Sequence, residues 1–498
     1  MKNSSRIDIN IVCADYGIKS ILSLGTSKSS VSPDRPDHEL KDKLVIMRVD
    51  FNLPMSACGT IVTDISRAIS NVPTIKYLIA CGAKILLLSH FGQPNKEVVN
   101  DPDLRKEYSF NKIIRDIEYT FDTKIVMIEP DDYQNYSGLK TKIENTIKQN
   151  PDAQVFLLEN IRFYQEEMQN NSEFAELFAN LAYIYVNDAF SASHRLHASV
   201  CGIPNKMPPN KRFAGLGLLS ELANLERYVG RFVNQNRLEP PIITAIVAGK
   251  KVSTKLPILE TLAKKVDHLI LGGAIANTFL RANGVEIGNS YYEENMIPEV
   301  IKLQQTSTRA MITLPADFVV LESQKAEVKI PLTGEMSIYS NNSQSIIKDF
   351  NKKNQITPKS TYKTVEIVNG NQQIGDLGPK TIENIKEILR KSDVLIWCGP
   401  LGIYENDNFR KGTTEIAKYI SSISILENND FTASDEQHNR HLISVAGGGD
   451  TIAALRYDHA NDDIVHAATY CSTAGGAFLD WLCTKVLVGI EAITQLNK

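Results

Sequence analysis

Polar and charged side chains repeatedly follow short apolar runs in the N-terminal half of this chain. They are Asp50, Asn52, Arg67, His90, Arg162, His194, Arg195 and His197. Arginine suits carboxylate and phosphate groups because its planar guanidinium donates two parallel hydrogen bonds. Each arginine alone is most simply a surface charge, but the whole set predicts one crevice for an anionic, hydroxylated ligand. The histidines have no further Cys or His pair to support them, so their spacing does not favour a metal site.

The C-terminal half carries two glycine-rich loops and a lysine-rich segment. Their residues are Gly447, Gly448, Gly449, Asp450 and Thr451 in SVAGGGDT, Gly475 and Gly476 in STAGGAF, and Lys251 and Lys255 in AGKKVSTK. Glycine lets backbone N–H groups approach phosphate oxygens, and the N-terminus of a following helix adds partial positive charge. The loops therefore predict a phosphate-binding region. Asp450 has two open roles, as a helix cap or as a ligand to Mg²⁺ in a nucleotide complex.

Two common nucleotide-binding patterns do not occur in the sequence. Neither glycine loop has the spacing GxxxxGKS or GxxxxGKT, which excludes a P-loop NTPase, and no convincing GxGxxG follows the first predicted strand. The second absence argues against a dehydrogenase of doubly wound fold. Tight binding of a nicotinamide cofactor would be needed to restore that alternative.

Short apolar runs alternate with segments of helical periodicity from residue 43 to the end of the chain. The runs read as strands are 44–49, 84–89, 155–159 and 184–188 in the first half, and 242–249, 268–273, 310–315, 393–400 and 442–449 in the second. Residues 69–80 and 173–181 are among the helical segments between them. This alternation predicts an α/β fold in which helices cover both faces of parallel sheets and ligands bind at the carboxyl ends of the strands.

The chain has 498 residues, too many for one hydrophobic core, and the pattern begins again after Pro240 and Pro241. We expect an N-terminal extension over 1–40 that need not be ordered, an N-terminal domain over 41–225, a C-terminal domain over 226–477, and a C-terminal helix over 478–498 that returns to the first domain. Residues 221–237 read as a connecting helix. The polar, Asn-rich stretch 323–364 is expected to be a solvated surface insertion.

The composition is typical of a globular protein and shows no global affinity for a polyanion. The net charge of −4 gives no field that would attract nucleic acid or an anionic membrane, so an anion site must be a local cluster. No apolar run of membrane-spanning length occurs, and residues 1–39 lack a signal-peptide core. A transit peptide is the less favoured alternative. The seven Cys form no CxxC pair, which fits a reducing cytosol and predicts a cytoplasmic protein.

Six motifs, taken in order, resemble the phosphoglycerate kinase family over about residues 41–495. They are RVDFN, LLENIRF, YVNDAF, LPADFV, GGGDT and the STAGG loop. The resemblance implies two Rossmann-like, doubly wound parallel-sheet domains joined by a hinge. It also implies a monomeric glycolytic phosphotransferase with a carboxyl group as acceptor, which interconverts 1,3-bisphosphoglycerate and ADP with 3-phosphoglycerate and ATP. The N-terminal domain would bind 3-phosphoglycerate, and the C-terminal domain would bind MgADP or MgATP.

The resemblance also implies roles for individual residues. Substrate binding falls to Asp50, Asn52, Arg67, His90, Arg162 and Arg195. Nucleotide binding falls to Lys251, Lys255, Gly272, Glu405, Gly448, Gly449, Asp450 and Thr451, with Asp450 meeting Mg²⁺ through the nucleotide and Glu405 reaching the ribose. Catalytic roles fall to Arg67, Lys251, Gly449 and Gly476, which would neutralise charge on the transferring phosphoryl group.

Some positions depart from the family's pattern. Gln93 stands where the family's SHLGRP has arginine, Lys250 where GGAKV has alanine, Cys398 where WNGP has asparagine, and Ala474 where the last loop has glycine. The departures motivate a second hypothesis, in which a phosphoglycerate kinase-like chain has lost activity and serves as a nucleotide-binding or regulatory partner. Retention of the predicted catalytic arginine and lysine favours the active enzyme.

Overall fold

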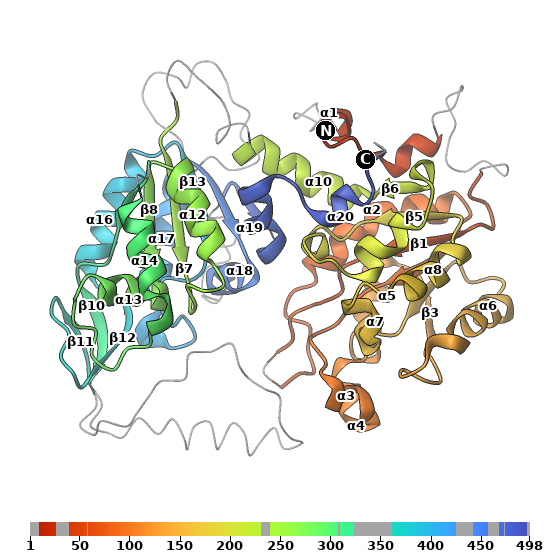
Figure 1. Cartoon of the computed structure of the whole chain (residues 1–498), viewed down its shortest axis with the longest axis horizontal. Helices are drawn as coiled ribbons and strands as arrows, with labels where there is room; N and C mark the ends of the chain where they lie inside the picture. Colours follow the sequence, from red (N-terminus) through yellow and green to blue (C-terminus); the bar gives the residue numbers. More distant parts are fainter. Residues whose placement is uncertain are drawn as a thin grey trace. The chain divides into compact units, whose positions relative to one another are not determined.

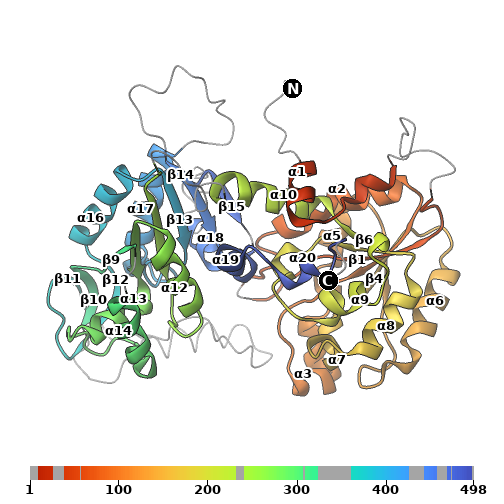
Figure 2. The ribbon, with the colours of Figure 1, turned by 45° about the horizontal axis from the view of Figure 1, so that its top comes forward.

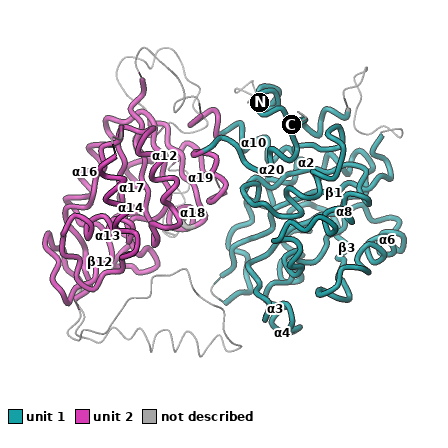
Figure 3. The backbone as a smooth tube through the Cα atoms, in the orientation of Figure 1, with its two compact units in different colours: residues 1–224, 484–498 teal, residues 225–483 magenta. Residues whose placement is uncertain are grey.

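The computed structural model describes residues 9–25, 39–56, 58–230, 240–306, 309–322, 361–424, 442–456, 468–472 and 474–495. The chain divides into two compact units (Figure 3). Unit 1 comprises Met1–Asn224 and Thr484–Lys498, and unit 2 comprises Leu225–Cys483. The chain passes from unit 2 back to unit 1 between residues 483 and 484, whereas the sequence analysis placed this boundary between 477 and 478. The reason is that the helix over Gly475–Thr484 packs almost entirely within unit 2.

Unit 1 is built on one parallel sheet of six strands in the order β3-β4-β2-β1-β5-β6. Strands β1, β3, β5 and β6 of this sheet are labelled in Figure 1. The strands are β1 (Leu44–Arg48), β2 (Lys84–Leu88), β3 (Ile125–Ile128), β4 (Val155–Leu158), β5 (Ile184–Asn187) and β6 (Arg212–Ala214). The helices are α1 (Ile9–Tyr16), α2 (Ser66–Ala80), α3 (Lys96–Asn100), α4 (Pro102–Arg105), α5 (Ile114–Phe121), α6 (Leu139–Gln149), α7 (Gln165–Met168), α8 (Ser172–Leu181), α9 (Ile203–Asn205), α10 (Leu216–Leu225) and α20 (Val488–Glu491).

Both faces of the central strands are buried, which explains why they read as unbroken apolar runs. Val45 and Met47 of β1 share one hydrophobic cluster with side chains of α2 and α5. Ile46, between them, is equally buried. Successive side chains of a strand point to opposite faces, so a sheet covered on both sides needs an apolar residue at nearly every position.

Described segments from the N-terminal and C-terminal parts of the chain lie side by side next to β6, and Figure 2 shows α1 and α20 in this region. The amide of Ala214 donates to the carbonyl of Lys19 at 2.8 Å, and the amide of Gln495 donates to the carbonyl of Gly17 at 2.8 Å. Nearby, the side chain of Asn187 donates to the carbonyl of Gly489 at 3.1 Å. Residues 9–25 are therefore an ordered part of unit 1 rather than a disordered extension, because their backbone groups pair with β6 and the C-terminal segment.

Unit 2 contains two sheets. The larger is parallel, in the order β15-β14-β13-β7-β8-β9, and the smaller is antiparallel, in the order β11-β10-β12. Strands of the larger sheet are β7 (Ile243–Ala248), β8 (His268–Gly272), β9 (Met311–Thr313), β13 (Val394–Cys398), β14 (Ile443–Gly447) and β15 (Tyr470–Ser472). Strands of the smaller sheet are β10 (Phe318–Glu322), β11 (Thr361–Val365) and β12 (Gln372–Leu377).

The helices of unit 2 follow the same α/β pattern. They are α12 (Leu256–Lys265), α13 (Gly273–Ala282), α14 (Ile297–Gln305), α16 (Pro379–Arg390), α17 (Lys411–Ile423), α18 (Gly449–Arg456) and α19 (Gly475–Thr484). Ile385 of α16 and Ile416 of α17 pack with Leu395 and Trp397 of β13 in one cluster, so α16 and α17 cover the same face of the larger sheet. None of the described helices in either unit is long and apolar enough to span a membrane.

The smaller sheet corrects the predicted surface insertion over residues 323–364. Residues 361–364 belong to strand β11, which pairs with β10, and are not part of a solvated loop. Residues 323–360, the rest of the predicted insertion, lie outside the described residues. The predicted connecting helix 221–237 corresponds to α10 followed by a π-helix over Glu226–Gly230, and residues 231–237 are likewise not described.

Two glycines of unit 2 allow a matched test of backbone strain. Gly288 and Gly284 both have positive φ, at +58° and +76°. A Cβ on Gly288 would lie 2.3 Å from the carbonyl oxygen of Gln372, whereas one on Gly284 would have no neighbour within 4 Å. We expect Gly284→Ala to lower the free energy of unfolding by about 1–2 kcal/mol, because alanine disfavours a positive φ. Gly288→Ala should lower it by about 1–3 kcal/mol more, because the added Cβ also overpacks against the carbonyl oxygen. Urea-induced unfolding would measure both, and equal losses would contradict the role of the close contact.

Candidate functional site

The carboxyl ends of neighbouring strands carry the predicted residues of unit 1. β4, β2, β1 and β5 are adjacent and parallel, so the loops that follow them share one edge of the sheet. Asp50 follows β1, His90 follows β2, Arg162 follows β4, and Arg195 lies in the loop after β5. Asp50, His90 and Arg162 are at most 5% exposed. The fold thus gathers residues that are far apart in the sequence.

Asp50 orients Arg67 at this edge. Arg67 lies in the first turn of α2, and its NH1 is 3.2 Å from Oδ2 of Asp50 and donates to the carbonyl of Asn52 at 2.9 Å. Ser191 also donates to Oδ2 of Asp50, and the amide of Asn52 donates to Oδ1 at 3.0 Å. This pairing fixes the direction of the guanidinium, which suits it to bind an anion.

Asn52 and Arg162 meet at Gly92, in the loop after β2. The amide of Gly92 donates to Oδ1 of Asn52 at 2.8 Å, and its carbonyl accepts from NH1 of Arg162 at 2.7 Å. Gly92 has φ of +64°, and a Cβ there would lie 2.5 Å from the ring of Tyr108, so only glycine fits. Nε of Arg162 is buried without a hydrogen-bond partner among the described residues. An unpaired buried donor is costly, so an anionic ligand would stabilise this arrangement.

Arg48 also belongs to this edge, although sequence reasoning missed it. It is the last residue of β1 and is 1% exposed. Its Nε donates to Oγ of Ser199 at 2.9 Å, its NH2 donates to Nδ1 of His90 at 3.0 Å, and its NH1 donates to the carbonyl of Val49. The available signal was a charged residue inside the apolar run 44–49, since arginine is almost never fully buried without a partner.

Burial and nearby arginines together set the protonation of the ionisable side chains at this edge. We call Arg48, Arg67, Arg162 and Arg195 the arginine cluster. Burial, followed by the charges of this cluster, holds the pKa of His90 well below its usual range. Burial and nearby arginines lower the pKa of His197 to about 3. Burial and repulsion within the cluster lower the pKa of Arg162 to about 10. At neutral pH the site therefore holds charged arginines beside neutral histidines.

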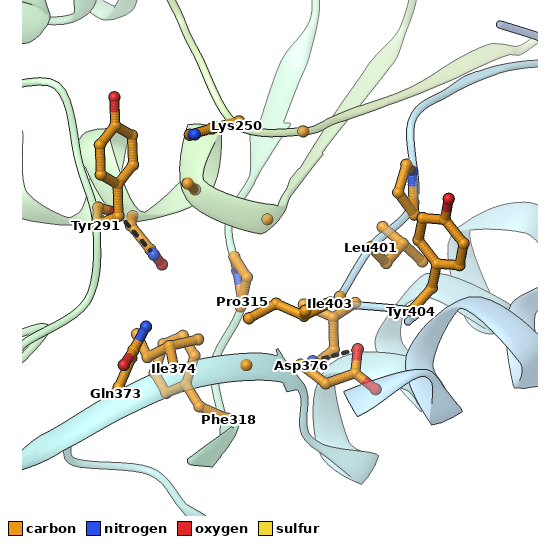
Figure 4. Close-up of a pocket in the computed structure, with 18 of the residues that line it drawn as sticks. Lys250, Tyr291, Pro315, Phe318, Gln373, Ile374, Asp376, Leu401, Ile403 and Tyr404 are labelled. Carbon is orange, nitrogen blue, oxygen red and sulfur yellow. Dashed lines mark hydrogen bonds between the residues drawn. The ribbon is translucent and has the colours of Figure 1, made fainter. Parts of the chain in front are cut away.

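Unit 2 contains a cavity of about 330 Å³ at the carboxyl edge of its larger sheet (Figure 4). Its walls come from the loops after β7 and β13, from α13, and from β10 and β12 of the smaller sheet. Lys250, Tyr291 and Glu405 line it, and Nζ of Lys250 lies 5.8 Å from the centroid of the Tyr291 ring. The volume falls within the range of about 300–1,000 Å³ that small-molecule pockets occupy. Its mixed apolar and polar lining suits a ligand with a flat ring and polar groups.

The two predicted glycine loops lie against each other beside this edge. A Cβ on Gly475 would lie 3.2 Å from Cα of Gly448, whose φ is +105°. Oγ1 of Thr451 accepts from the amide of Gly399 at 2.7 Å and donates to the carbonyl of Gly447 at 2.8 Å. Thr451 therefore ties the loop after β13 to the loop after β14, and its hydroxyl proton is used within the protein.

The predicted cations of unit 2 differ in their surroundings. Nζ of Lys255 donates to the carbonyl of Ala248 at 2.7 Å and lies 3.4 Å from that of Cys398, which anchors it at the ends of β7 and β13. Lys251 follows β7 but is not part of the cavity wall. The helices that follow the glycine loops begin at Gly449 and Gly475, so Gly476 lies in a first turn, and Gly272 precedes α13.

Metal binding was predicted for Asp450 alone, through the nucleotide. Asp450 is the second residue of α18, but its side chain lies outside the described part of the structure. Within the described ranges, no group of three or more His, Cys, Asp or Glu side chains is placed to hold a metal ion.

Comparison with known proteins identifies the family. The phosphoglycerate kinase family model matches residues 36–485. The chain belongs to the phosphoglycerate kinase family. Phosphoglycerate kinase of Wolbachia from Brugia malayi is 34% identical over 467 residues, covering 93% of this chain and 98% of the relative. Phosphoglycerate kinase of Rhizobium meliloti is 35% identical, covering 92% and 98% respectively.

Solved structures lead to the same family. The structure of phosphoglycerate kinase from Coxiella burnetii is 29% identical, with a TM-score of 0.62, and the match covers 92% of this chain and 97% of that one. Phosphoglycerate kinase from Pyrococcus horikoshii, at 23% identity, shares the fold with a TM-score of 0.63. The α/β fold with two parallel sheets, predicted from the alternation of runs and helices, is thereby confirmed.

The departures from the phosphoglycerate kinase pattern have different surroundings. Gln93 is exposed beside Gly92, and Lys250 lies in the cavity wall. Cys398 is buried at the end of β13, where burial raises the pKa of its thiol to about 12, so it stays protonated at neutral pH. Ala474 is buried, and its amide donates to Oγ of Ser472 at 3.3 Å. Only Lys250 places a new charge at the predicted nucleotide cavity.

The lowered pKa of His197 predicts acid sensitivity in unit 1. Its folded pKa of about 3 lies below the ordinary value of 6.5, so the unfolded chain takes up a proton first and stability falls as pH drops from about 6.5 toward 3. We expect His197→Gln to reduce the loss of stability between pH 7 and pH 5. Urea midpoints followed by far-UV circular dichroism at both pH values would show this. Equal losses of stability in the variant and the wild type would mean that another titrating group causes the acid sensitivity.

Proposed function

We propose that this chain interconverts 1,3-bisphosphoglycerate and ADP with 3-phosphoglycerate and ATP, as a phosphotransferase of glycolysis. The arginine cluster carries the proposal, because it concentrates positive charge, with Arg48 and Arg162 buried, where a carboxylate and a phosphate would bind. Membership of the phosphoglycerate kinase family supports it. From the family resemblance we further propose that the enzyme acts as a cytoplasmic monomer.

Unit 1 is proposed to bind 3-phosphoglycerate through Asp50, Asn52, Arg67, His90, Arg162 and Arg195. Guanidinium groups donate charge-assisted hydrogen bonds of about 1.5–3 kcal/mol each to phosphate and carboxylate oxygens. His90, neutral because of burial and the arginine cluster, contributes a hydrogen bond rather than a charge. Asp50 and Asn52 are placed to orient Arg67 and the loop at Gly92.

Unit 2 is proposed to bind the nucleotide. The cavity would receive the base and ribose, with Glu405 near the ribose, because its wall combines apolar side chains with polar groups. Lys251, Lys255 and the loop residues Gly272, Gly448, Gly449 and Thr451 would surround the phosphates, with backbone N–H groups at the starts of α13 and α18. Mg²⁺, held by phosphate oxygens and by Asp450, would offset the negative charge of the nucleotide.

Phosphoryl transfer needs in-line placement of the two ligands and compensation of charge on the equatorial oxygens, with little covalent work for the protein. We propose that Arg67 and Lys251 supply cations for this step and that the amides of Gly449 and Gly476 donate hydrogen bonds. Asp50 contributes indirectly, because it holds the guanidinium of Arg67 at 3.2 Å.

The proposal is tested by ATP consumption with 3-phosphoglycerate and Mg²⁺, coupled to reduction of the acyl phosphate product. We expect turnover of about 1–100 s⁻¹, the usual kinase range, and a strong loss in Arg67→Ala with nearly unchanged nucleotide affinity. Exposed Gln93→Ala is a matched control for a change at the same edge of unit 1. No turnover from a folded, nucleotide-binding wild type would favour the second hypothesis, a binding or regulatory partner.

Lys250 predicts a nucleotide-specific effect. Its ammonium lies on the Tyr291 side of the cavity, and a cation close to a bound, negatively charged nucleotide would contribute about 1 kcal/mol. We therefore expect Lys250→Ala to raise the KM for ATP about fivefold and to leave the KM for 3-phosphoglycerate unchanged. Steady-state kinetics with each substrate varied in turn would measure this. A lower KM for ATP would instead mean that the side chain narrows the cavity.

A further inference from the structure

One buried carboxylate close to the arginine cluster was not among the predicted substrate-binding residues. Glu167 is in the short helix α7 and is fully buried. Its Oε2 accepts from the amide of Ser199 at 2.7 Å, and its Oε1 accepts from Oγ of Ser199 at 2.6 Å. Burial raises the pKa of Glu167, while Arg48 and Arg162 act in the opposite direction. A carboxylate in this position is costly unless donors and cations compensate it.

Ser199 links this carboxylate to Arg48. Ser199 lies in the π-helix Ala198–Gly202, and its carbonyl accepts from the hydroxyl of Tyr185 at 2.7 Å, which fixes its backbone. A serine hydroxyl has one proton, and Ser199 donates it to Glu167. Its oxygen therefore acts as the acceptor for Nε of Arg48 at 2.9 Å. The direction of every hydrogen bond from Arg48 to Glu167 is thus determined.

The other end of Arg48 determines the tautomer of His90. Arginine can only donate hydrogen bonds, and NH2 of Arg48 lies 3.0 Å from Nδ1 of His90. Nδ1 must then carry the lone pair, so a neutral His90 has its proton on Nε2. Burial and the surrounding arginines keep this imidazole neutral. His90 consequently offers a ligand an N–H group at Nε2.

We propose that Glu167 is a positioning residue for the anionic substrate, acting through Ser199 and Arg48 to hold His90 as the Nε2–H tautomer. Without the carboxylate, Ser199 loses the partner that orients its hydroxyl, and Arg48 loses the directed acceptor at Nε. The inference rests on the proposed binding of 3-phosphoglycerate at the arginine cluster. Glu167 is fully buried and would not touch a bound substrate, so its loss should affect substrate binding more than the transfer step.

Glu159 provides a matched control. It is also a buried glutamate of unit 1, 3% exposed, and its carboxylate accepts from Oγ of Ser109 at 2.5 Å and from the amide of Phe110 at 3.0 Å. Burial raises its pKa as it does for Glu167. The difference lies in the donor to each serine hydroxyl: among the described residues Oγ of Ser109 accepts from the amide of Asn111, whereas Oγ of Ser199 accepts from Arg48.

The experiment compares Glu167→Gln, Ser199→Ala and Glu159→Gln in the full chain. We expect the first two to raise the KM for 3-phosphoglycerate about tenfold while kcat and the KM for ATP stay within about twofold. Glu159→Gln should lower the urea midpoint without this selective change. Ser199→Ala keeps the amide donor to Glu167, so it remains informative if Glu167→Gln does not fold.

The tautomer is measured independently of turnover. Long-range ¹H–¹⁵N correlation spectra of histidine-labelled protein would show His90 as the Nε2–H form in wild type, assigned by its absence in His90→Asn. We expect a mixture of tautomers in Glu167→Gln and Ser199→Ala. Unchanged KM and an unchanged tautomer in both variants would overturn the positioning role. A wild type without turnover would instead count against the proposed function, while the spectra would still test the hydrogen-bond chain.

Discussion

Like-charge repulsion among buried arginines is the constraint on which unit 1 depends. Arg48 and Arg162 are nearly inaccessible to solvent, and burial, followed by the charges of Arg195 and Arg48, lowers the pKa of Arg162. Guanidinium groups stay protonated even so, because their ordinary pKa is far above neutrality. The surroundings must therefore compensate the charge, and Asp50, Glu167 and carbonyls at the end of β2 and in the loop after it do so. Burial, reinforced by the same repulsion, keeps His90 and His197 neutral.

This constraint explains why the site is assembled from so many elements. No single loop could hold several guanidinium groups close together, because each needs its own acceptor in a fixed direction. Parallel strands meet this requirement, because the loops that follow β4, β2, β1 and β5 all lie at the same edge of the sheet. α2 then supplies Arg67, and α7 and the π-helix Ala198–Gly202 supply Glu167 and Ser199 behind them. An arriving anion would relieve repulsion that the fold has already organised, which is a form of electrostatic preorganisation.

Unit 2 meets a different requirement with different residues. Its predicted ligand carries charge at one end and a flat ring at the other, so the site needs close backbone approach as well as cations. Glycines allow backbone segments to lie close together. A Cβ on Gly399 would lie 2.0 Å from the carbonyl oxygen of Ala248, and a Cβ on Gly475 would lie 3.2 Å from Cα of Gly448. Lys255 is held by the carbonyl of Ala248, and Thr451 joins the loops after β13 and β14. The antiparallel sheet β11-β10-β12 completes the cavity wall.

The sequence by itself determined the parallel α/β architecture, the strand-end position of Asp50, His90 and Arg162, and the family. It could do so because strands buried on both faces must be apolar along their length, and because chemistry at the carboxyl edge requires polar residues directly after them. Only the tertiary structure decided the role of Arg48, the link from Glu167 through Ser199, and the ordering of residues 9–25. These depend on contacts between distant segments, such as Arg48 with Ser199, whose hydrogen-bond directions no local pattern encodes. The smaller sheet of unit 2 was not predicted for the same reason, because β10 pairs with β11 and β12, which begin much later in the sequence, at Thr361 and Gln372.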